Sequence, residues 1–178
     1  DLSKNREPIS SDIVLTNNFE EIISDEDIDI IIELIGGETP ALEYIKSSLA
    51  AEKIVITANK LLIANYFKEL ITLAQKHKTH IFFEASTAGG IPIINTIEDY
   101  LAGDKINELH GILNGTTNYI LSVMEKETVS MPETIKKAQK LGYAEQDPGS
   151  DLEGLDALYK IVILANLAFS CAVNPEDI

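Results

Sequence analysis

The chain has 178 residues, 45% of them hydrophobic and 24% charged, and its 14 Lys and Arg stand against 29 Asp and Glu for a formal net charge of −15. This length and composition allow a sizeable buried core, which excludes a wholly disordered chain. The acidic balance argues against binding to nucleic acid or to an anionic membrane, because both need a basic patch.

Cysteine content and apolar runs indicate the compartment. Cys171 is the only cysteine, so the chain has neither a disulfide framework nor a thiolate metal site, and a reducing cytoplasm is expected. The opening residues DLSKNREPIS lack the regions of a signal peptide. The longest apolar stretches, such as 161–169, are too short to span a bilayer. We therefore expect a cytoplasmic protein, and the initial Asp indicates that this is not the native start.

The first half of the chain alternates strands and helices. β-branched runs bounded by charged residues and glycine predict buried strands, and apolar residues at helical spacing predict amphipathic helices. This spacing calls for right-handed crossovers and a parallel sheet, so we expect one side of a doubly wound α/β sheet. The predicted strands are 29–36, 53–58 and 80–86, and the predicted helices are 41–53 and 59–78.

The second half shows a different pattern. The Ser130 hydroxyl and the Glu133 carboxylate predict a capping box, and Gly142 predicts the end of the helix that this box begins. In chain order, we expect a helix at 91–103, a strand at 105–113, a turn at 114–117, and helices at 118–126, 132–141 and 151–170.

Both ends of the predicted sheets look unfinished. A dinucleotide-binding sheet normally begins with a strand and a G-x-G-x-x-G turn, yet no glycine precedes Asp29. At the other end, no strand follows that would complete a sheet begun by 105–113. We therefore expect this chain to be an internal piece of a larger protein.

Asp156 and Lys160 are the strongest candidates for chemistry, because they lie four residues apart on one helical face. An exposed ion pair of this kind contributes only about 0.3–0.5 kcal/mol and has no chemical role. Lys160, however, directly precedes an apolar stretch, where desolvation lowers the pKa of a lysine toward a range useful for proton transfer. The pair is therefore a candidate acid/base device.

Lys60 is a second candidate, because it follows the predicted strand 53–58. Ligands of open α/β sheets bind beyond the carboxyl ends of the strands. A solvated lysine in the first turn of a helix explains the same position equally well, although the helix dipole slightly disfavours it.

A loop before the last predicted helix carries Glu145, Asp147 and Asp151. Clustered carboxylates can hold a substrate ammonium or a cation, but a polar loop explains them too. For Asp151 alone we favour a helix cap, and for Glu145 the spacing does not decide. The glycine-containing turns at 87–90 and 114–117 would either let a ligand approach the backbone or simply reverse the direction of the chain.

Five motifs follow one another along the chain: ELIGG at 33–37, ITANK at 56–60, EASTAGGIPII at 84–94, GILNGTTNYIL at 111–121 and LGYAEQDPGSDLEGLDALYK at 141–160. In this order, they closely resemble homoserine dehydrogenase, over roughly residues 29–169. This resemblance implies the reversible reduction of aspartate 4-semialdehyde to homoserine with NADPH or NADH, on the route to threonine and methionine.

The resemblance also implies roles for individual residues. Lys160 corresponds to the proton donor, Asp156 orders it, and Lys60 lies where nicotinamide and substrate meet. Glu145 corresponds to the acid that holds the substrate's amino group. The other implied residues are Gly115, Thr116 and Asp151 for the substrate, Gly36 and Gly37 with Lys60 for the cofactor, and Glu84, Thr87, Gly89 and Ile91 for a monovalent cation such as Na⁺.

The implied domain organisation is the second part of a dinucleotide-binding domain, with a partial Rossmann-like parallel sheet, at 1–90. Part of an α+β catalytic and dimerisation domain follows at 91–178. We expect a homodimer for the full-length enzyme and no activity for this piece alone. The alternative is a non-catalytic Rossmann-like module for assembly or sensing, which would have no use for the candidate catalytic residues.

Overall fold

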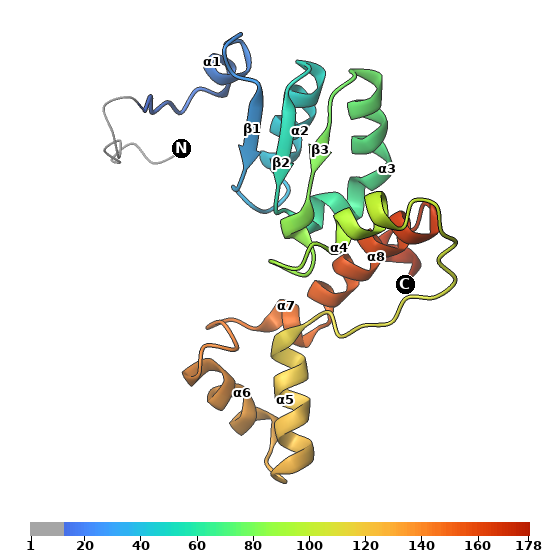
Figure 1. The fold of residues 1–178 in the computed structure, drawn as a ribbon. Helices are drawn as coiled ribbons and strands as arrows, with labels where there is room; N and C mark the ends of the chain where they lie inside the picture. The colour runs from blue at the N-terminus through green and yellow to red at the C-terminus, as the bar shows by residue number, and fades with distance from the viewer. Residues whose placement is uncertain (1–12) are drawn as a thin grey trace. The chain divides into compact units, whose positions relative to one another are not determined.

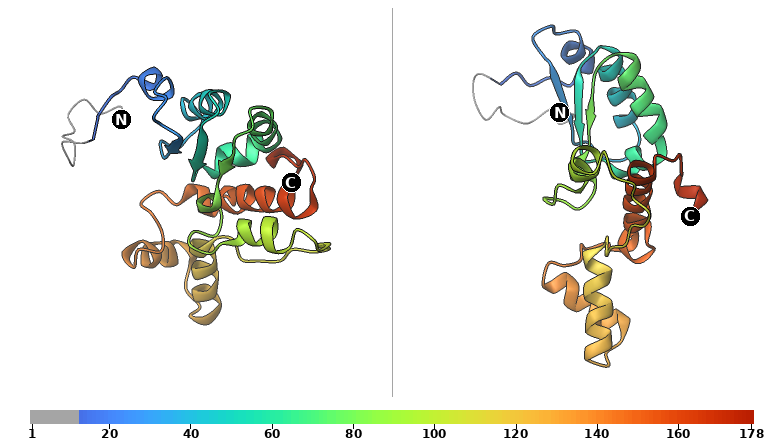
Figure 2. Two further views of the ribbon diagram at one scale, coloured as in Figure 1. Left: turned by 45° about the horizontal axis from the view of Figure 1, so that its top comes forward. Right: turned by 45° about the vertical axis from the view of Figure 1, so that its right-hand side comes forward.

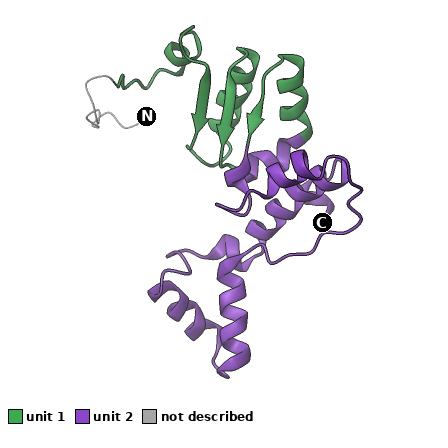
Figure 3. Cartoon of the chain, viewed as in Figure 1, with its two compact units in different colours: residues 1–59, 68–82 green, residues 60–67, 83–178 purple. Residues whose placement is uncertain are grey.

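The computed structural model describes residues 13–178. They form two compact units, which Figure 3 shows in different colours. The first unit contains the described residues up to Asn59 together with 68–82, and the second contains 60–67 and 83–178. Helix α3 (Lys60–Lys76) contributes to both units, and its backbone leaves helical geometry at Tyr66.

The first unit is built on a parallel sheet, as the sequence predicts (Figure 1). Its strands lie in the order β1 (Ile30–Glu33), β2 (Ile54–Thr57) and β3 (Ile81–Phe82), with β2 paired to both neighbours. Helix α2 (Ala41–Ala50) connects β1 to β2, and α3 connects β2 to β3. The strands are shorter than predicted. A short helix, α1 (Phe19–Ile23), precedes the sheet and was not predicted.

The two faces of this sheet differ in burial. Both crossover helices lie on the same side of the sheet (Figure 2), and Val55 is fully buried. The opposite face carries Ile32, Ile56 and Phe82, which are neighbours in the ladder register and remain exposed. Parallel sheets are usually covered on both faces, so this apolar face is open to further packing.

The second unit is helical throughout its described elements. Its elements are η1 (Glu84–Ser86), α4 (Ile93–Asn95), the π-helical turn η2 (Thr96–Tyr100), α5 (Gly115–Lys126), α6 (Met131–Lys140), α7 (Gly149–Leu152), α8 (Leu155–Phe169) and η3 (Pro175–Asp177). Helix α5 packs against α6 and α7 around Ile120, Ala138 and Ala144, and the apolar α8 buries Val162 and Ile163. The capping box of Ser130 and Glu133 is confirmed, and Gly142 has a positive φ of 79°.

Several predicted elements are wrong. Residues 105–113 form no strand, because none of the described strands pairs with them and a lone extended segment has no ladder to join. The predicted helix 91–103 is divided into α4 and the π-helical turn η2. The predicted turn 114–117 is instead the start of α5, with Asn114 as its N-cap.

The predicted helix 151–170 is also interrupted. Gly154 has a φ of +82°, a left-handed conformation that ends α7 and precedes the first residue of α8. Asp151 therefore lies inside α7, and the prediction that it caps the long helix is wrong. Cys171 is exposed. No helix of the described residues is long and apolar enough to cross a membrane.

Candidate active site

Asp156 lies at the centre of the candidate site in the second unit. It occupies the first turn of α8 and is only 4% exposed. Its Oδ2 accepts a hydrogen bond from Lys160 Nζ at 2.7 Å, and its Oδ1 is 2.5 Å from Lys60 Nζ. One buried carboxylate therefore binds two ammonium groups, one from its own helix and one from the start of α3.

The two lysines differ in their surroundings. The Lys160 side chain is 19% exposed, and its Nζ also donates to the carbonyl of Leu113 at 2.9 Å. The Lys60 side chain is 38% exposed, so its ammonium keeps more contact with solvent. The pairing of Asp156 with Lys160 is thus confirmed, and it is a partly buried contact rather than an exposed helix pair. Lys60 is brought to the same carboxylate, which sequence spacing could not show.

The charge state of Asp156 follows from these contacts. Burial by itself raises the pKa of the carboxyl, but hydrogen bonds from Lys160, Lys60 and Asn114 outweigh this effect and hold the pKa below its usual range. Asp156 is therefore ionised at neutral pH. With two ammoniums and one carboxylate, the trio carries a net positive charge, which favours negative charge developing on a nearby oxygen.

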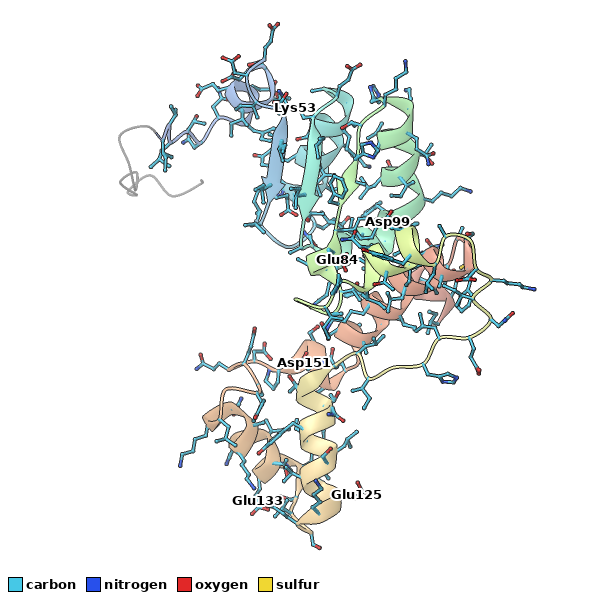
Figure 4. The ribbon with its side chains drawn as sticks, viewed as in Figure 1. Lys53, Glu84, Asp99, Glu125, Glu133 and Asp151 are labelled. Atoms are coloured by element: carbon cyan, nitrogen blue, oxygen red, sulfur yellow. The ribbon has the colours of Figure 1, made fainter. Side chains whose placement is uncertain are left out.

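Asn114 is a site residue that the sequence analysis missed. Its Nδ2 donates to Asp156 Oδ2 at 2.8 Å and to Asp151 Oδ1 at 2.7 Å, and its side chain is buried. Figure 4 labels Asp151, which lies on α7 beside the start of α5. An Asn before Gly-Thr-Thr is a recognisable N-cap signal, but its partners lie 37 and 42 residues further along the chain. We call Lys60, Asn114, Asp156 and Lys160 the Asp156 cluster.

The other predicted substrate residues lie outside these contacts. Gly115 is the exposed first residue of α5, and the buried Thr116 donates its hydroxyl to the carbonyl of Tyr143 at 2.8 Å. Thr116 thereby holds the loop that carries Glu145. Glu145 itself is exposed, and its main-chain carbonyl accepts a hydrogen bond from the side chain of Gln139. The structure does not bring the Glu145 carboxylate to the Asp156 cluster.

The predicted cofactor glycines belong to the first unit, after β1. Gly36 and Gly37 have φ values of 77° and 68°, in the left-handed region that favours glycine. Glu33 is 4% exposed, and its Oε1 accepts the backbone N–H groups of Ile35 and Gly36 at 2.7 and 3.1 Å. Its Oε2 accepts the hydroxyl of Thr57 at 2.6 Å. A buried carboxylate thus holds the glycine loop at the carboxyl end of the sheet.

The residues predicted to bind a cation lie around η1. Glu84 accepts the backbone N–H groups of Ile94 and Asn95, each at 2.9 Å, through its two carboxylate oxygens. The carbonyl of the buried Thr87 accepts the N–H of Gly89, whose φ is 58°. Ile91 is exposed. Within residues 13–178, no group of three or more His, Cys, Asp and Glu side chains is arranged to hold a metal ion.

Two family models match most of the chain. A family model for the homoserine dehydrogenase NAD-binding domain matches residues 1–84, and one for homoserine dehydrogenase matches residues 92–178. The homoserine dehydrogenase of Bacillus subtilis is 48% identical over the whole chain, which spans 41% of that protein's length. The homoserine dehydrogenase of Synechocystis is 47% identical over 93% of the chain, which spans 38% of its length.

Solved structures agree with this match. The crystal structure of a homoserine dehydrogenase from Thiobacillus denitrificans is 44% identical, with a TM-score of 0.85 over 90% of this chain and 37% of that one. A hyperthermophilic archaeal homoserine dehydrogenase in complex with NADPH is 32% identical, with a TM-score of 0.79 over 88% of this chain and 48% of that one.

The parallel sheet of the first unit and the matched models together define part of an α/β dinucleotide-binding protein with a Rossmann-type domain. The chain belongs to the homoserine dehydrogenase family. It spans about 40% of the length of the curated relatives that it matches.

Proposed function

We propose that the whole protein reduces L-aspartate 4-semialdehyde to L-homoserine with NADPH or NADH, as part of threonine and methionine biosynthesis. The observation that carries this proposal is the Asp156 cluster, in which a buried carboxylate binds the ammonium groups of Lys60 and Lys160. The substrate and the reaction are those of the homoserine dehydrogenase family. The Asp156 cluster contains charged groups that are suited to this reaction.

The proposed roles follow from the charges of the cluster. Reduction of the aldehyde adds a hydride to carbon and a proton to oxygen, so negative charge grows on the oxygen before the proton arrives. The Lys160 ammonium stabilises that charge and donates the proton, and Asp156 orients the ammonium. Lys60, the more exposed lysine, is proposed to stand beside the reacting groups. Glu145 is proposed to bind the substrate's amino group, with Gly115, Thr116 and Asp151 as further substrate residues.

A nicotinamide cofactor fits the loop after β1. A Cβ built on Gly36 or Gly37 would meet no atom within 4 Å, and both residues have the positive φ of a loop that lets a ligand approach the backbone. We propose that these glycines and Lys60 contact the cofactor, which supplies the hydride. Glu33 would keep the loop in place through its hydrogen bonds to Ile35 and Gly36.

We also propose a monovalent cation held by the Glu84 carboxylate and the carbonyls of Thr87, Gly89 and Ile91. A carboxylate and carbonyl oxygens are hard donors of the kind that alkali cations accept. Two further acids lie near Glu84, since burial and then the charges of Asp99 and Glu84 raise the pKa of Glu98. A Na⁺ titration tests this: activity should rise with Na⁺, and Glu84→Gln should need more Na⁺ for half-maximal activity. Activity independent of alkali cations would contradict it.

Further proposals concern the whole protein: it is a cytoplasmic homodimer, and the 178-residue chain alone is inactive. The support for inactivity is that the chain spans only 41% of the length of the Bacillus subtilis relative. NADPH oxidation by the isolated chain at a rate near that of the whole protein would contradict the last proposal.

The central test follows NADPH absorbance with aspartate 4-semialdehyde and the whole protein. Lys160→Ala should lower kcat by about 100-fold to 10,000-fold, the range of general acid catalysis. Lys137→Ala is the matched control. Lys137 lies on α6, and its ammonium forms an exposed ion pair with Glu127 at 2.8 Å. This substitution should leave kcat unchanged. A parental kcat in a natively folded Lys160→Ala variant would overturn the assigned role.

A further inference from the structure

The side chain of Asn114 has all of its hydrogen-bonding capacity in use. Its Oδ1 accepts the backbone N–H and the hydroxyl of Thr117 at 2.8 and 2.9 Å. Its Nδ2 donates to Asp156 Oδ2 and to Asp151 Oδ1 at 2.8 and 2.7 Å. A carboxamide has two N–H donors and two acceptor lone pairs, and all four are paired here.

These partners also fix the orientation of the amide. If the oxygen and nitrogen were exchanged, the carbonyl would face two carboxylates and the amide group would face the N–H donor of Thr117. Both contacts would be lost or repulsive, so the observed orientation is the only satisfied one. The first turn of α5 therefore sets where the Nδ2 protons point.

The two carboxylates that share Nδ2 have unequal surroundings. Asp156 binds two lysines, whereas Asp151 lies on the short helix α7 and is part-buried. Two neighbouring carboxylates repel each other, and hydrogen-bond donors that both of them share offset this repulsion. Asn114 supplies both donors without adding a charge, and it shares Oδ2 of Asp156 with Lys160.

We infer that Asn114 is a positioning residue of the reaction, which fixes the Asp156 carboxylate relative to Lys160 and couples it to Asp151. This inference rests on the proposed function. Asn114 acts through Asp156 and Lys160. Its loss should therefore lower kcat and leave the KM for the nucleotide unchanged.

The helix-capping role of Asn114 has to be separated from this coupling. Asn, Asp and Ser are about equally good N-caps, so Asn114→Ser and Asn114→Asp both keep α5 capped. Asn114→Ser removes the bridging amide, and Asn114→Asp replaces the donors with a third carboxylate. A loss of kcat shared by both variants therefore reports on the amide and not on the cap.

The experiment measures kcat, the KM values and the pH–rate profile of the whole protein and its variants. We expect Asn114→Ser to lower kcat by about 10-fold to 100-fold, in keeping with the loss of one or two hydrogen bonds to a charged group. Asn114→Asp should lower kcat and move the profile to higher pH, because a carboxylate beside Lys60, Asp151, Asp156 and Lys160 favours protonated lysine. Ser130→Ala, which removes the capping box of α6, is the control and should retain the parental kcat.

Two results would overturn the inference, and they differ from a failure of the proposed function. A parental kcat and pH profile in folded Asn114→Ser would exclude a positioning role. An equal loss of activity in Ser130→Ala would show that loss of a cap alone suffices. If the unsubstituted whole protein does not reduce the aldehyde, the proposed function itself fails before any variant is compared.

Discussion

Two carboxylates, Glu33 in the first unit and Asp156 in the second, are both only 4% exposed, yet their partners differ in charge. Glu33 is held by the hydroxyl of Thr57 and by two backbone N–H groups, and within residues 13–178 only neutral donors reach it. Asp156 is held by two ammonium groups and one carboxamide.

The difference shows what a buried carboxylate does in each unit. Backbone donors cannot leave without unfolding the loop, so Glu33 fixes the conformation of the chain after β1. Lysine side chains can turn toward a ligand and give up a proton, so Asp156 organises groups that can react. Burial alone does not identify a chemical site, because both residues are equally buried. The charge of the partners distinguishes them.

The largest expected effect separates the two carboxylates by kinetics. In the whole protein, Asp156→Asn should lower kcat by about 100-fold or more, because it releases both lysines. Glu33→Gln should raise the KM for the nucleotide by about 5-fold to 10-fold, equivalent to about one lost hydrogen bond, with a kcat close to the parental value. Steady-state kinetics measure both effects, and the reverse pattern would show that the two carboxylates do not have these different roles.

A smaller effect is expected from Thr57→Val, which removes the hydroxyl bonded to Glu33 at 2.6 Å. An unsatisfied oxygen of a buried carboxylate costs about 1–3 kcal/mol. Amide hydrogen exchange should therefore become faster at Ile35 and Gly36, whose N–H groups bind the same carboxylate. Thr57→Ser keeps the hydroxyl and serves as the control. Unchanged exchange in Thr57→Val would show that Glu33 does not depend on this bond.

The low pKa of Asp156 predicts a pH dependence of stability. Because the folded pKa lies below the unfolded value of about 3.9, the contribution of Asp156 is complete above that pH and is lost as the pH falls through the folded pKa. The difference in free energy of unfolding between the parent and Asp156→Asn should therefore be constant near neutrality and shrink in acid. Denaturant titrations at a series of pH values measure it. A difference that grows on acidification has the wrong sign for this account.

The smallest effect concerns an exposed carboxylate, Glu133, which accepts the Ser130 hydroxyl at 2.8 Å. Hydrogen bonds from Ser130 lower the pKa of Glu133, although solvent surrounds this carboxylate. Ser130→Ala should reduce the stability of α6 by about 1 kcal/mol, the usual value of an N-cap, and leave kcat unchanged. Circular dichroism during thermal unfolding tests the first part. Unfolding of the whole second unit in Ser130→Ala would show that the stability of this unit depends on α6.

The sequence predicts those parts of the fold and site that depend on local spacing. Strand–helix alternation predicts the parallel sheet, and the four-residue spacing predicts the contact of Asp156 with Lys160. Position after a strand marks Lys60 as a candidate without revealing its partner, because that partner is far away in the chain.

The failures have physical causes as well. The alternating pattern of 105–113 predicts a strand, but a strand also needs a neighbour, and the described residues supply none. Asp151 precedes an apolar helix and resembles its cap, yet the left-handed conformation of Gly154 starts that helix later. Asn114 is recognisable as an N-cap, but the bridge between Asp151 and Asp156 exists only once α5, α7 and α8 have come together.

If Lys60, Lys160 and Asp156 act as one unit, a double-mutant cycle of the two lysines will reveal it. The kcat of the whole protein is compared with those of Lys60→Met, Lys160→Met and the double variant, each checked for native folding. Residues that act as a unit give strongly non-additive losses. We predict a double variant within about tenfold of the slower single variant. If the fold-loss of kcat in the double variant equals the product of the two single losses, the lysines act independently. That result would contradict the proposal that they act as one unit.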